Sequence, residues 1–169
     1  IITLLFILSC GNGKKENAFT AESVDFNPDS LVTMHHDAKT VRGQLLYMPV
    51  YSNLPYNSEG TNFDMKAYVA IHNTDLKKSI TITKVIYFNQ KGKPVYDFMK
   101  TKKISLGPLA TQDFHIPYED KSGIGANFLI EWVSGSPVSE PLAECVTVSL
   151  RPNHSLAITS RGVVIKEIK

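Results

Sequence analysis

Apolar and polar residues alternate along most of the chain after residue 40, with a period of two instead of the 3.6 of a helix. Leu46, Met48 and Val50 share one parity, and residues 65–71 repeat the pattern. Such a period places successive side chains on opposite faces of an extended segment, so both runs predict half-buried strands. No window of helical length keeps a 3.6-residue period, and the chain is therefore predicted to be all-β.

A third strand is predicted over residues 80–88, with Ile86 and Phe88 on the same inward face as the isoleucines before them. Lys84 interrupts that face, which indicates a bulge or an edge. The segment 89–93 then predicts a hairpin turn with Gly92 in the left-handed conformation. Later alternating runs predict strands near 95–98, 104–106, 114–118, 128–132 and 146–148, and a final pair, 157–159 and 163–165, joined through Ser160, Arg161 and Gly162.

About seven to nine short strands with turn signals roughly every 8–12 residues predict a two-sheet antiparallel sandwich, immunoglobulin-like in architecture. A closed barrel is the alternative, because strand number does not separate the two. Trp132, on the most hydrophobic strand, suits a sandwich core. The predicted sandwich lacks the pair of cysteines found in antibody domains. Cys10 lies outside the predicted sandwich, which contains one cysteine, Cys145.

The segment before the predicted sandwich divides in two. Residues 1–9 are apolar apart from one Thr and one Ser, and they end against Cys10 and Gly11, as the apolar part of a secretion signal ends at a cleavage site. The run is too short to span a bilayer, which takes about 20 apolar residues. Residues 11–40 are polar, with apolar residues spaced singly, which predicts a flexible tether. The predicted domains are a signal remnant (1–9), a lipidated N-terminus and tether (10–40) and a β-sandwich (41–169).

The four residues Ile7–Cys10 resemble the lipobox of bacterial lipoproteins. The resemblance implies that Cys10 carries a thioether-linked diacylglycerol, becomes the first residue of the mature protein and is acylated on its amine. The residue after Gly11 is Asn12. The absence of an Asp at this position resembles the pattern of lipoproteins that are sent to the outer membrane. The bilayer is thus the first expected partner, with the periplasmic or the external face left open. An ordinary signal peptide with an incidental cysteine is the alternative.

The composition adds limits on function. The chain is 43% hydrophobic and 20% charged, which excludes a wholly disordered protein. Its 18 basic and 16 acidic side chains leave a net charge of +2, too little for a nucleic-acid surface. If Cys10 is lipidated, Cys145 has no partner for an internal disulfide, and its β-rich surroundings predict a buried, unreactive thiol.

Four ordered motifs resemble those of an uncharacterised bacterial envelope family, domain of unknown function 3124. They are Leu46–Ser52, Ile71–Asp75, Val85–Gly92 and Gly125–Trp132. The resemblance implies an envelope location and a β-rich fold, and it implies no activity, since none is established for the family. The chain departs from the family pattern at residues 122–125, where it has Ser-Gly-Ile-Gly before the final motif instead of a Gly-Gly pair.

Two groups of residues are candidates for binding. The loop with Asp120, Ser122, Gly123, Gly125 and Asn127 could contact a ligand or partner, or offer backbone N–H groups to an anion. The alternative is a tight strand entry in which glycine tolerates a positive φ.

Tyr47, Tyr51 and Tyr56 form a candidate aromatic patch. Aromatic residues with polar tips are enriched at interfaces, and they are equally suited to a core in which the hydroxyl finds a partner. Both interpretations stay open from the sequence.

No catalytic constellation is apparent. Residues 134–136 lack the spacing of a nucleophile elbow, and Glu119, Asp120, Glu131 and Glu140 are acidic residues of a kind that any surface offers. The sequence therefore predicts no catalytic residues, no metal and no cofactor, and a non-enzymatic envelope module that binds an envelope protein or glycan. The alternatives are a cryptic hydrolase acting on glycans and a metal-handling lipoprotein that uses Met34, His35 and His36.

Overall fold

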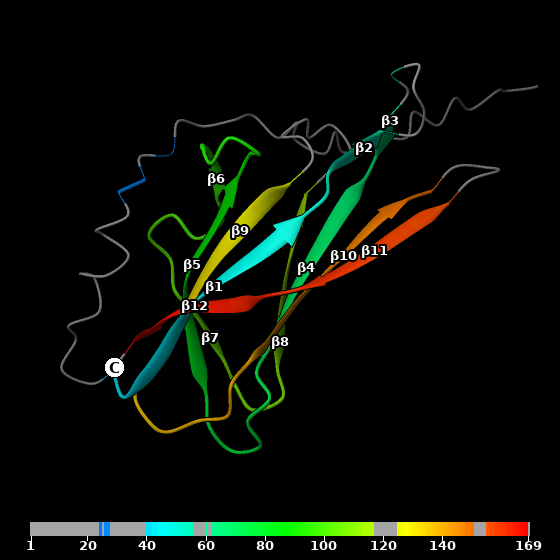
Figure 1. The fold of residues 1–169 in the computed structure, drawn as a ribbon. Coiled ribbons are helices and arrows are strands. Elements are labelled where there is room, and N and C mark those ends of the chain that lie inside the picture. Colours follow the sequence, from blue (N-terminus) through cyan, green and yellow to red (C-terminus); the bar gives the residue numbers. More distant parts are fainter. Residues whose placement is uncertain are drawn as a thin grey trace, which may run out of the picture.

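The computed structural model describes residues 24, 26–27, 40–55, 60, 62–116, 125–150 and 155–168. In this part of the chain all regular elements are strands, and there are twelve of them (Figure 1). They are β1 (Arg42–Val50), β2 (Asn53–Pro55), β3 (Asn62–Asp64), β4 (Lys66–His72), β5 (Ile80–Phe88), β6 (Pro94–Asp97), β7 (Ile104–Leu106), β8 (Thr111–Ile116), β9 (Ala126–Ser134), β10 (Leu142–Ser149), β11 (Leu156–Arg161) and β12 (Val163–Ile168).

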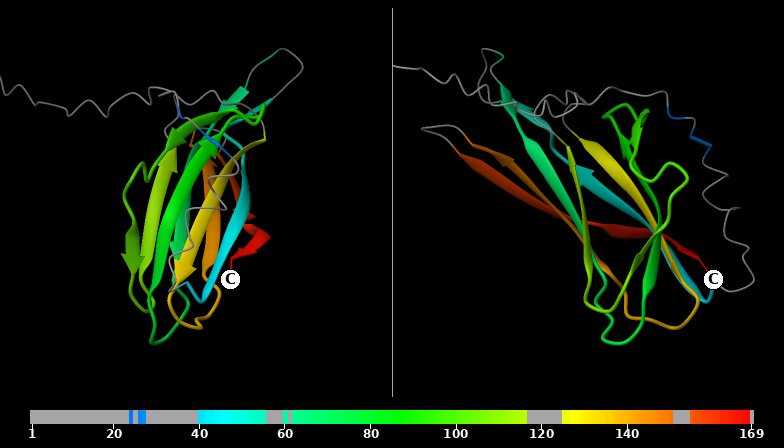
Figure 2. Two further views of the ribbon diagram at one scale, coloured as in Figure 1. Left: turned by 90° about the vertical axis from the view of Figure 1, so that its left-hand side faces the viewer. Right: turned by 180° about the vertical axis from the view of Figure 1, so that it is seen from behind.

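The strands form two principal antiparallel sheets. The six-stranded sheet has the order β12-β1-β9-β5-β6, with β7 also paired to β5. The four-stranded sheet has the order β11-β10-β4-β8, and β2 and β3 form a small separate ribbon. Figures 1 and 2 show the two principal sheets as two layers. The prediction of an all-β fold with antiparallel sheets arranged as a sandwich is confirmed, while its immunoglobulin-like character stays a prediction.

One continuous core fills the space between the two sheets. The six-stranded sheet contributes Trp132, Phe128 and Tyr87, which are fully buried, and the four-stranded sheet contributes smaller side chains such as Val69 and Cys145. The inward parity predicted for β1 is confirmed, because Leu46, Met48 and Val50 all lie in this cluster. Burial of this much apolar surface is the main force that holds the layers together.

A bulge in β5 changes which of its residues face the core. The register against β9 shifts between Ile82 and Lys84, so the expected irregularity is confirmed. An inserted residue reverses the side-chain parity of everything that follows it. As a result Val85 and Tyr87 enter the core, and the prediction that Ile86 and Phe88 face inward is wrong.

The final two strands are not a hairpin pair. Gly162 is the single residue between β11 and β12, and the two strands pair with different neighbours, β10 and β1. The backbone N–H of Gly162 donates to the carbonyl oxygen of Ala143 at 2.9 Å. In a hairpin turn, the hydrogen bond would instead join the two strands that the turn connects. One extended segment thus crosses from the four-stranded to the six-stranded sheet, as the orange-red and red arrows in Figure 1 show.

Gly92 and Gly125 have a positive φ, which the sequence predicts for Gly92 and offers as one of two interpretations for Gly125. Gly92 has φ +71° in the turn after β5, and its N–H donates to the carbonyl oxygen of Asn89 at 2.9 Å. Gly125 has φ +79° directly before β9. Glycine reaches this region without the steric cost that a Cβ brings. Within the described ranges, no helix has the length and apolar character needed to cross a membrane.

Candidate functional site

Three of the loop and aromatic-patch candidates that the structure describes, Tyr51, Gly125 and Asn127, lie at one end of the six-stranded sheet. Asn127 pairs with Pro49 of β1 on one side and with Phe88 of β5 on the other. Ala126 pairs with Val50, so Gly125 and Tyr51 continue from neighbouring strand ends. Tyr51 is half-buried, Asn127 is half-buried and Gly125 is exposed. This strand end is the part of the predicted loop and aromatic patch that the structure brings together.

Tyr47 belongs to the same strand but not to the same end. It pairs with Leu129 of β9 and Val163 of β12, and it is half-buried in the middle of the sheet. Several further sequence candidates lie outside the described residues: Cys10, Met34, His35, His36, Tyr56, Glu119, Asp120, Ser122 and Gly123.

Glu131 is held in a closed environment and does not face solvent. Its side chain is completely buried, and its Oε1 accepts a hydrogen bond of 2.7 Å from the Thr83 hydroxyl. Thr83 lies in the bulge of β5, whose extra residue brings the hydroxyl over β9. A carboxylate in this position cannot reach a glycosidic bond in solvent, so the structure does not support Glu131 as a candidate for glycoside hydrolysis.

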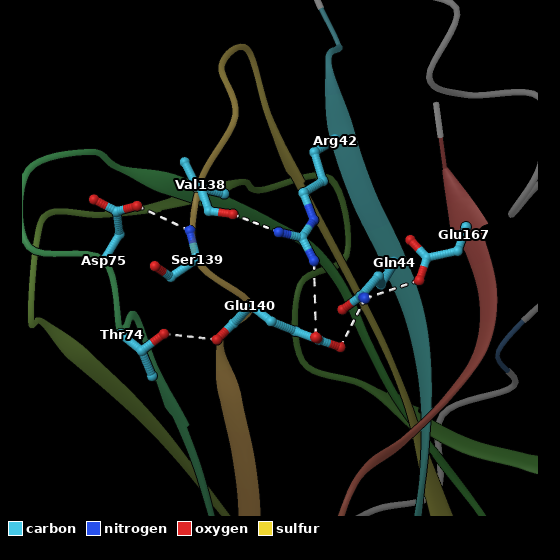
Figure 3. A network of polar contacts seen from close by, with 8 residues as sticks. All are labelled: Arg42, Gln44, Thr74, Asp75, Val138, Ser139, Glu140 and Glu167. Carbon is cyan, nitrogen blue, oxygen red and sulfur yellow. Dashed lines mark hydrogen bonds and ion pairs between the residues drawn. The ribbon is translucent and has the colours of Figure 1, made fainter.

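The opposite end of the sandwich carries a set of polar contacts that the sequence analysis did not predict (Figure 3). We call it the loop network. Its members come from β1, from the connections 73–79 and 135–141, and from β12. They are Arg42, Gln44, Thr74, Asp75, Val138, Ser139, Glu140 and Glu167.

Gln44 is the centre of the loop network. It is 1% exposed, and its Nε2 donates to Glu140 Oε1 at 2.8 Å and to Glu167 Oε1 at 3.0 Å. The Arg42 guanidinium donates to the Val138 carbonyl oxygen at 2.5 Å and lies 3.7 Å from Glu140 Oε2. Two carboxylates therefore converge on one buried amide, and this contact ties β1 to β12 and to the connection before β10.

Thr74 and Asp75 attach the connection after β4 to the same place. The Thr74 hydroxyl donates to the Glu140 carbonyl oxygen at 2.6 Å, and the Ser139 N–H donates to Asp75 Oδ2 at 2.9 Å. Asp75 Oδ1 also accepts from the backbone N–H groups of Lys77 (2.8 Å) and Lys78 (2.9 Å). Three backbone donors on one carboxylate make it a structural group that closes two loops.

Next to these residues, Asn73 holds three chain segments together. Its Nδ2 donates to the carbonyl oxygens of Lys78 (2.8 Å), Leu106 (3.1 Å) and Gly107 (2.8 Å), and its Oδ1 accepts from the Asp75 N–H at 3.0 Å. The side chain is 1% exposed. A primary amide combines two N–H donors with a carbonyl acceptor on one short, uncharged side chain, so asparagine fits these contacts.

The backbone hydrogen bonds to Asp75 predict a pH dependence of stability. They lower the pKa of its carboxyl below the ordinary 3.8, the bond from Lys77 most, followed by those from Ser139 and Lys78. A lowered folded-state pKa contributes stability above the unfolded value, and this contribution is lost as the pH falls through the folded value. Asp75→Asn is expected to destabilise the protein at neutral pH, by an amount that shrinks below about pH 4. Urea unfolding at several pH values measures this, and a difference that does not change with pH would contradict it.

Cys145 is buried in β10, as the sequence predicts. Burial raises the pKa of its thiol, while contacts with Thr147 and Ser160 lower it by less. Because the thiolate is the reactive form, Cys145 in a chain with Cys10→Ser is expected to react with a thiol reagent orders of magnitude more slowly in the native than in the urea-unfolded protein. Reaction rates measured with and without urea test this. A fast native rate would mean that β10 opens readily.

The described histidines serve as surface and strand residues. His72 Nδ1 lies 2.8 Å from the Thr111 hydroxyl, and its Nε2 lies 3.5 Å from Glu144 Oε1. His115 is exposed on β8. In the ranges that the structure describes, no group of three or more His, Cys, Asp or Glu side chains is placed to hold a metal ion.

A family model described as "Protein of unknown function (DUF3124)" matches residues 43–165. The chain belongs to this family. The resemblance seen in the four sequence motifs is thereby confirmed. No curated protein matches the chain. The crystal structure of Thermotoga maritima 1070 is similar over 71% of this chain and 92% of that chain, with 13% sequence identity and a TM-score of 0.42.

Several residues of the DUF3124 motifs in this chain hold the fold together. Asn73 and Asp75 close the loops at one end, and Gly92 forms the turn after β5. Trp132 is fully buried in the core. Gln44, the centre of the loop network, precedes the first motif and was missed. It shares the inward parity of Leu46, and a polar residue at an inward position is the signal that could have revealed it.

Proposed function

We propose that this DUF3124 protein is a lipid-anchored protein of the bacterial envelope, held at the outer membrane, whose sandwich is a non-enzymatic module that binds an envelope protein or glycan. The observation that carries the proposal is the apolar run of residues 1–9 followed directly by Cys10 and Gly11. A cysteine at this point of a signal resembles the acylation site of bacterial lipoproteins. Acyl chains contribute about 0.8 kcal/mol per buried methylene, and two or more chains make anchoring stable.

The contacts of the described acidic side chains support a binding role over a catalytic one. Glu131 is buried and accepts from Thr83, Asp75 accepts three backbone hydrogen bonds, and Glu140 accepts from the side-chain amide of Gln44. Each of these carboxylates already has hydrogen-bond donors from the protein. A general acid or base needs instead to reach the proton that it transfers.

The strand end with Tyr51, Gly125 and Asn127 supports a location for binding. Loops at the ends of a rigid sandwich present groups to partners without disturbing the core. Tyr51 and Asn127 are both half-buried at this strand end, and they offer an apolar ring and hydrogen-bonding groups. This combination suits a polar partner such as a glycan or an extended peptide.

Lipidation is tested by expressing the chain in a bacterial host fed with a labelled fatty acid. The expected result is a mature chain that begins at Cys10, carries the label and partitions into detergent. Cys10→Ser is expected to abolish labelling. Cys145→Ala is the matched control, since it removes the chain's other cysteine and should leave labelling intact. An unacylated N-terminus in the unchanged chain would overturn the anchoring part of the proposal.

The non-enzymatic part has its own test. The full chain is incubated with a panel of envelope glycans, alongside Glu140→Gln and Glu167→Gln, which alter the two carboxylates that converge on Gln44. The proposal expects no turnover by any of the three proteins. Hydrolysis by the unchanged chain that either substitution abolishes would establish the hydrolase alternative instead.

A further inference from the structure

The two outer faces of the sandwich differ in burial. On the four-stranded sheet, Tyr68 of β4 and Val146 of β10 are neighbours that remain 46% and 39% exposed. On the six-stranded sheet, Ile86 and Phe88 of β5 also point away from the core, yet they are 3% and 4% exposed. The outer face of an antiparallel sandwich normally meets water. The part of the second face around β5 is therefore covered, whereas Val163 and Ile165 of β12, at the edge of the same sheet, are 56% and 54% exposed.

Two more outward side chains share this burial. Leu45 pairs with Glu131 across β1 and β9, on the face opposite to the core positions, and the two are 7% and 0% exposed. Together with Ile86 and Phe88 they define what we call the covered face. A buried carboxylate among apolar side chains is costly unless it is hydrogen-bonded, and Thr83 supplies one such bond here.

A residue from the N-terminal segment packs on the covered face. The ring of Phe26 lies 4.9 Å from the ring of Phe88, centre to centre, at an interplanar angle of 83°. This is the edge-to-face geometry that aromatic pairs favour. Val24 and Phe26 are half-buried, while Asn27 is exposed. Figure 2 shows this short blue segment on the side of the six-stranded sheet that faces away from the four-stranded sheet.

We propose that the covered face is a docking face and that its occupant is the chain's own segment around Phe26, bound within the same molecule. Phe26 is the anchor of that segment, because its ring meets Phe88 where an unoccupied sheet would expose apolar surface. The N-terminal segment therefore does not act as one uninterrupted spacer between the N-terminus and the sandwich. It is attached to the body at Phe26, ahead of the first strand.

This attachment goes beyond the proposed function, and it has one consequence that rests on it. If Cys10 holds the lipid, its first attachment to the body lies 16 residues along the chain, at Phe26, instead of 31 residues along it, at Val41. At about 3.5 Å per residue, the longest reach falls from about 110 Å to about 55 Å. Release of Phe26 would double the reach, so a partner that binds the covered face would also let the body move further from the bilayer.

A double-mutant cycle tests the anchor in the full chain, kept in solution with a mild detergent. Phe26→Ala is expected to raise the unfolding equilibrium constant about two- to tenfold, which corresponds to the stabilisation that one aromatic pair contributes. In a Phe88→Leu background the same substitution should have little effect. Leu76→Ala, at a side chain that is 73% exposed, is the matched control and should be neutral in both backgrounds. Equal effects of Phe26→Ala in both backgrounds, or none in either, would overturn the proposal.

A second experiment decides whether docking occurs within one molecule. A spin label is attached to Asn27→Cys in a chain with Cys10→Ser and Cys145→Ala, and broadening of the Ile86 methyl signals is followed by NMR. The proposal expects broadening when label and isotope are in one chain. It expects none when spin-labelled chains are mixed with isotope-labelled ones. Broadening in the mixture would show exchange of the segment between two copies, and no broadening in either sample would show no docking. Both results contradict the proposal, and neither bears on acylation of Cys10.

Discussion

Replacement of Gly43 by alanine is expected to destabilise the sandwich by about 3 kcal/mol, the upper part of the range for an overpacked site. A Cβ at this position would lie 2.6 Å from the carbonyl oxygen of Trp132 and 3.0 Å from Cγ1 of Val133. The first of these atoms is backbone, and β1 is held by β9 on this side and by β12 on the other. The strand cannot move away without losing ladder hydrogen bonds, so the clash is not relieved cheaply.

Gly162→Ala is the matched control for this prediction. A Cβ there would meet its nearest atoms, in Ala143 and Leu46, at 3.4–3.6 Å, which is ordinary contact. The expected change is neutral or a gain of about 0.4–1 kcal/mol, because alanine restricts the unfolded chain. Urea unfolding of both variants measures the difference. Similar stabilities of the two variants would contradict the clash at Gly43.

Asn73→Asp is expected to cost about 3–5 kcal/mol, the range for an uncompensated charge left buried. The substitution keeps the size of the side chain and removes the donor that serves the carbonyl oxygens of Lys78, Leu106 and Gly107. It also places a negative charge against those oxygens, which raises the folded-state pKa of the new carboxyl. A raised pKa contributes stability at low pH, so part of the loss should be recovered on acidification.

Asn89→Asp is the matched control, because it also replaces an amide by a carboxylate but should leave the stability unchanged. Asn89 Oδ1 accepts from the backbone N–H groups of Lys91 (2.9 Å) and Lys93 (3.0 Å), and a carboxylate preserves that acceptor. The expected change is within about 0.5 kcal/mol, as for ordinary surface positions. Thermal unfolding of both variants at neutral and acidic pH provides the comparison. A mild effect of Asn73→Asp would show that the three carbonyl oxygens find other donors.

These two predictions concern residues whose importance the sequence indicated to different degrees. Asn73 lies in a motif of the DUF3124 resemblance, although its contacts with Leu106 and Gly107 span more than 30 residues and no local pattern shows them. Gly43 was not singled out. Its requirement for glycine comes from the approach of β9, which is visible only once the two strands are paired.

The alternation of residue types predicted most of the strands and failed where tertiary contacts intervene. The parity of β1 was predicted correctly because Leu46, Met48 and Val50 follow one another without interruption. In β5 the bulge exchanged the two faces, and Lys84 indicated the irregularity but not its effect. The candidate loop and aromatic patch were predicted separately, and the pairing of Asn127 with Pro49 brings parts of them to one strand end.

By itself the sequence determined that this chain is built of antiparallel strands, that Cys145 is buried and that its motifs are those of DUF3124. Each of these properties can be recognised from a short stretch of residues. For the strands and for Cys145 the reason is that side-chain direction repeats every two residues along a strand. The tertiary structure alone decided that β11 and β12 join different sheets, that Gln44 gathers two carboxylates, and that Phe26 packs on Phe88. Each of these depends on residues far apart in the chain, whose meeting is set by the packing of the whole core and not by any neighbouring residue.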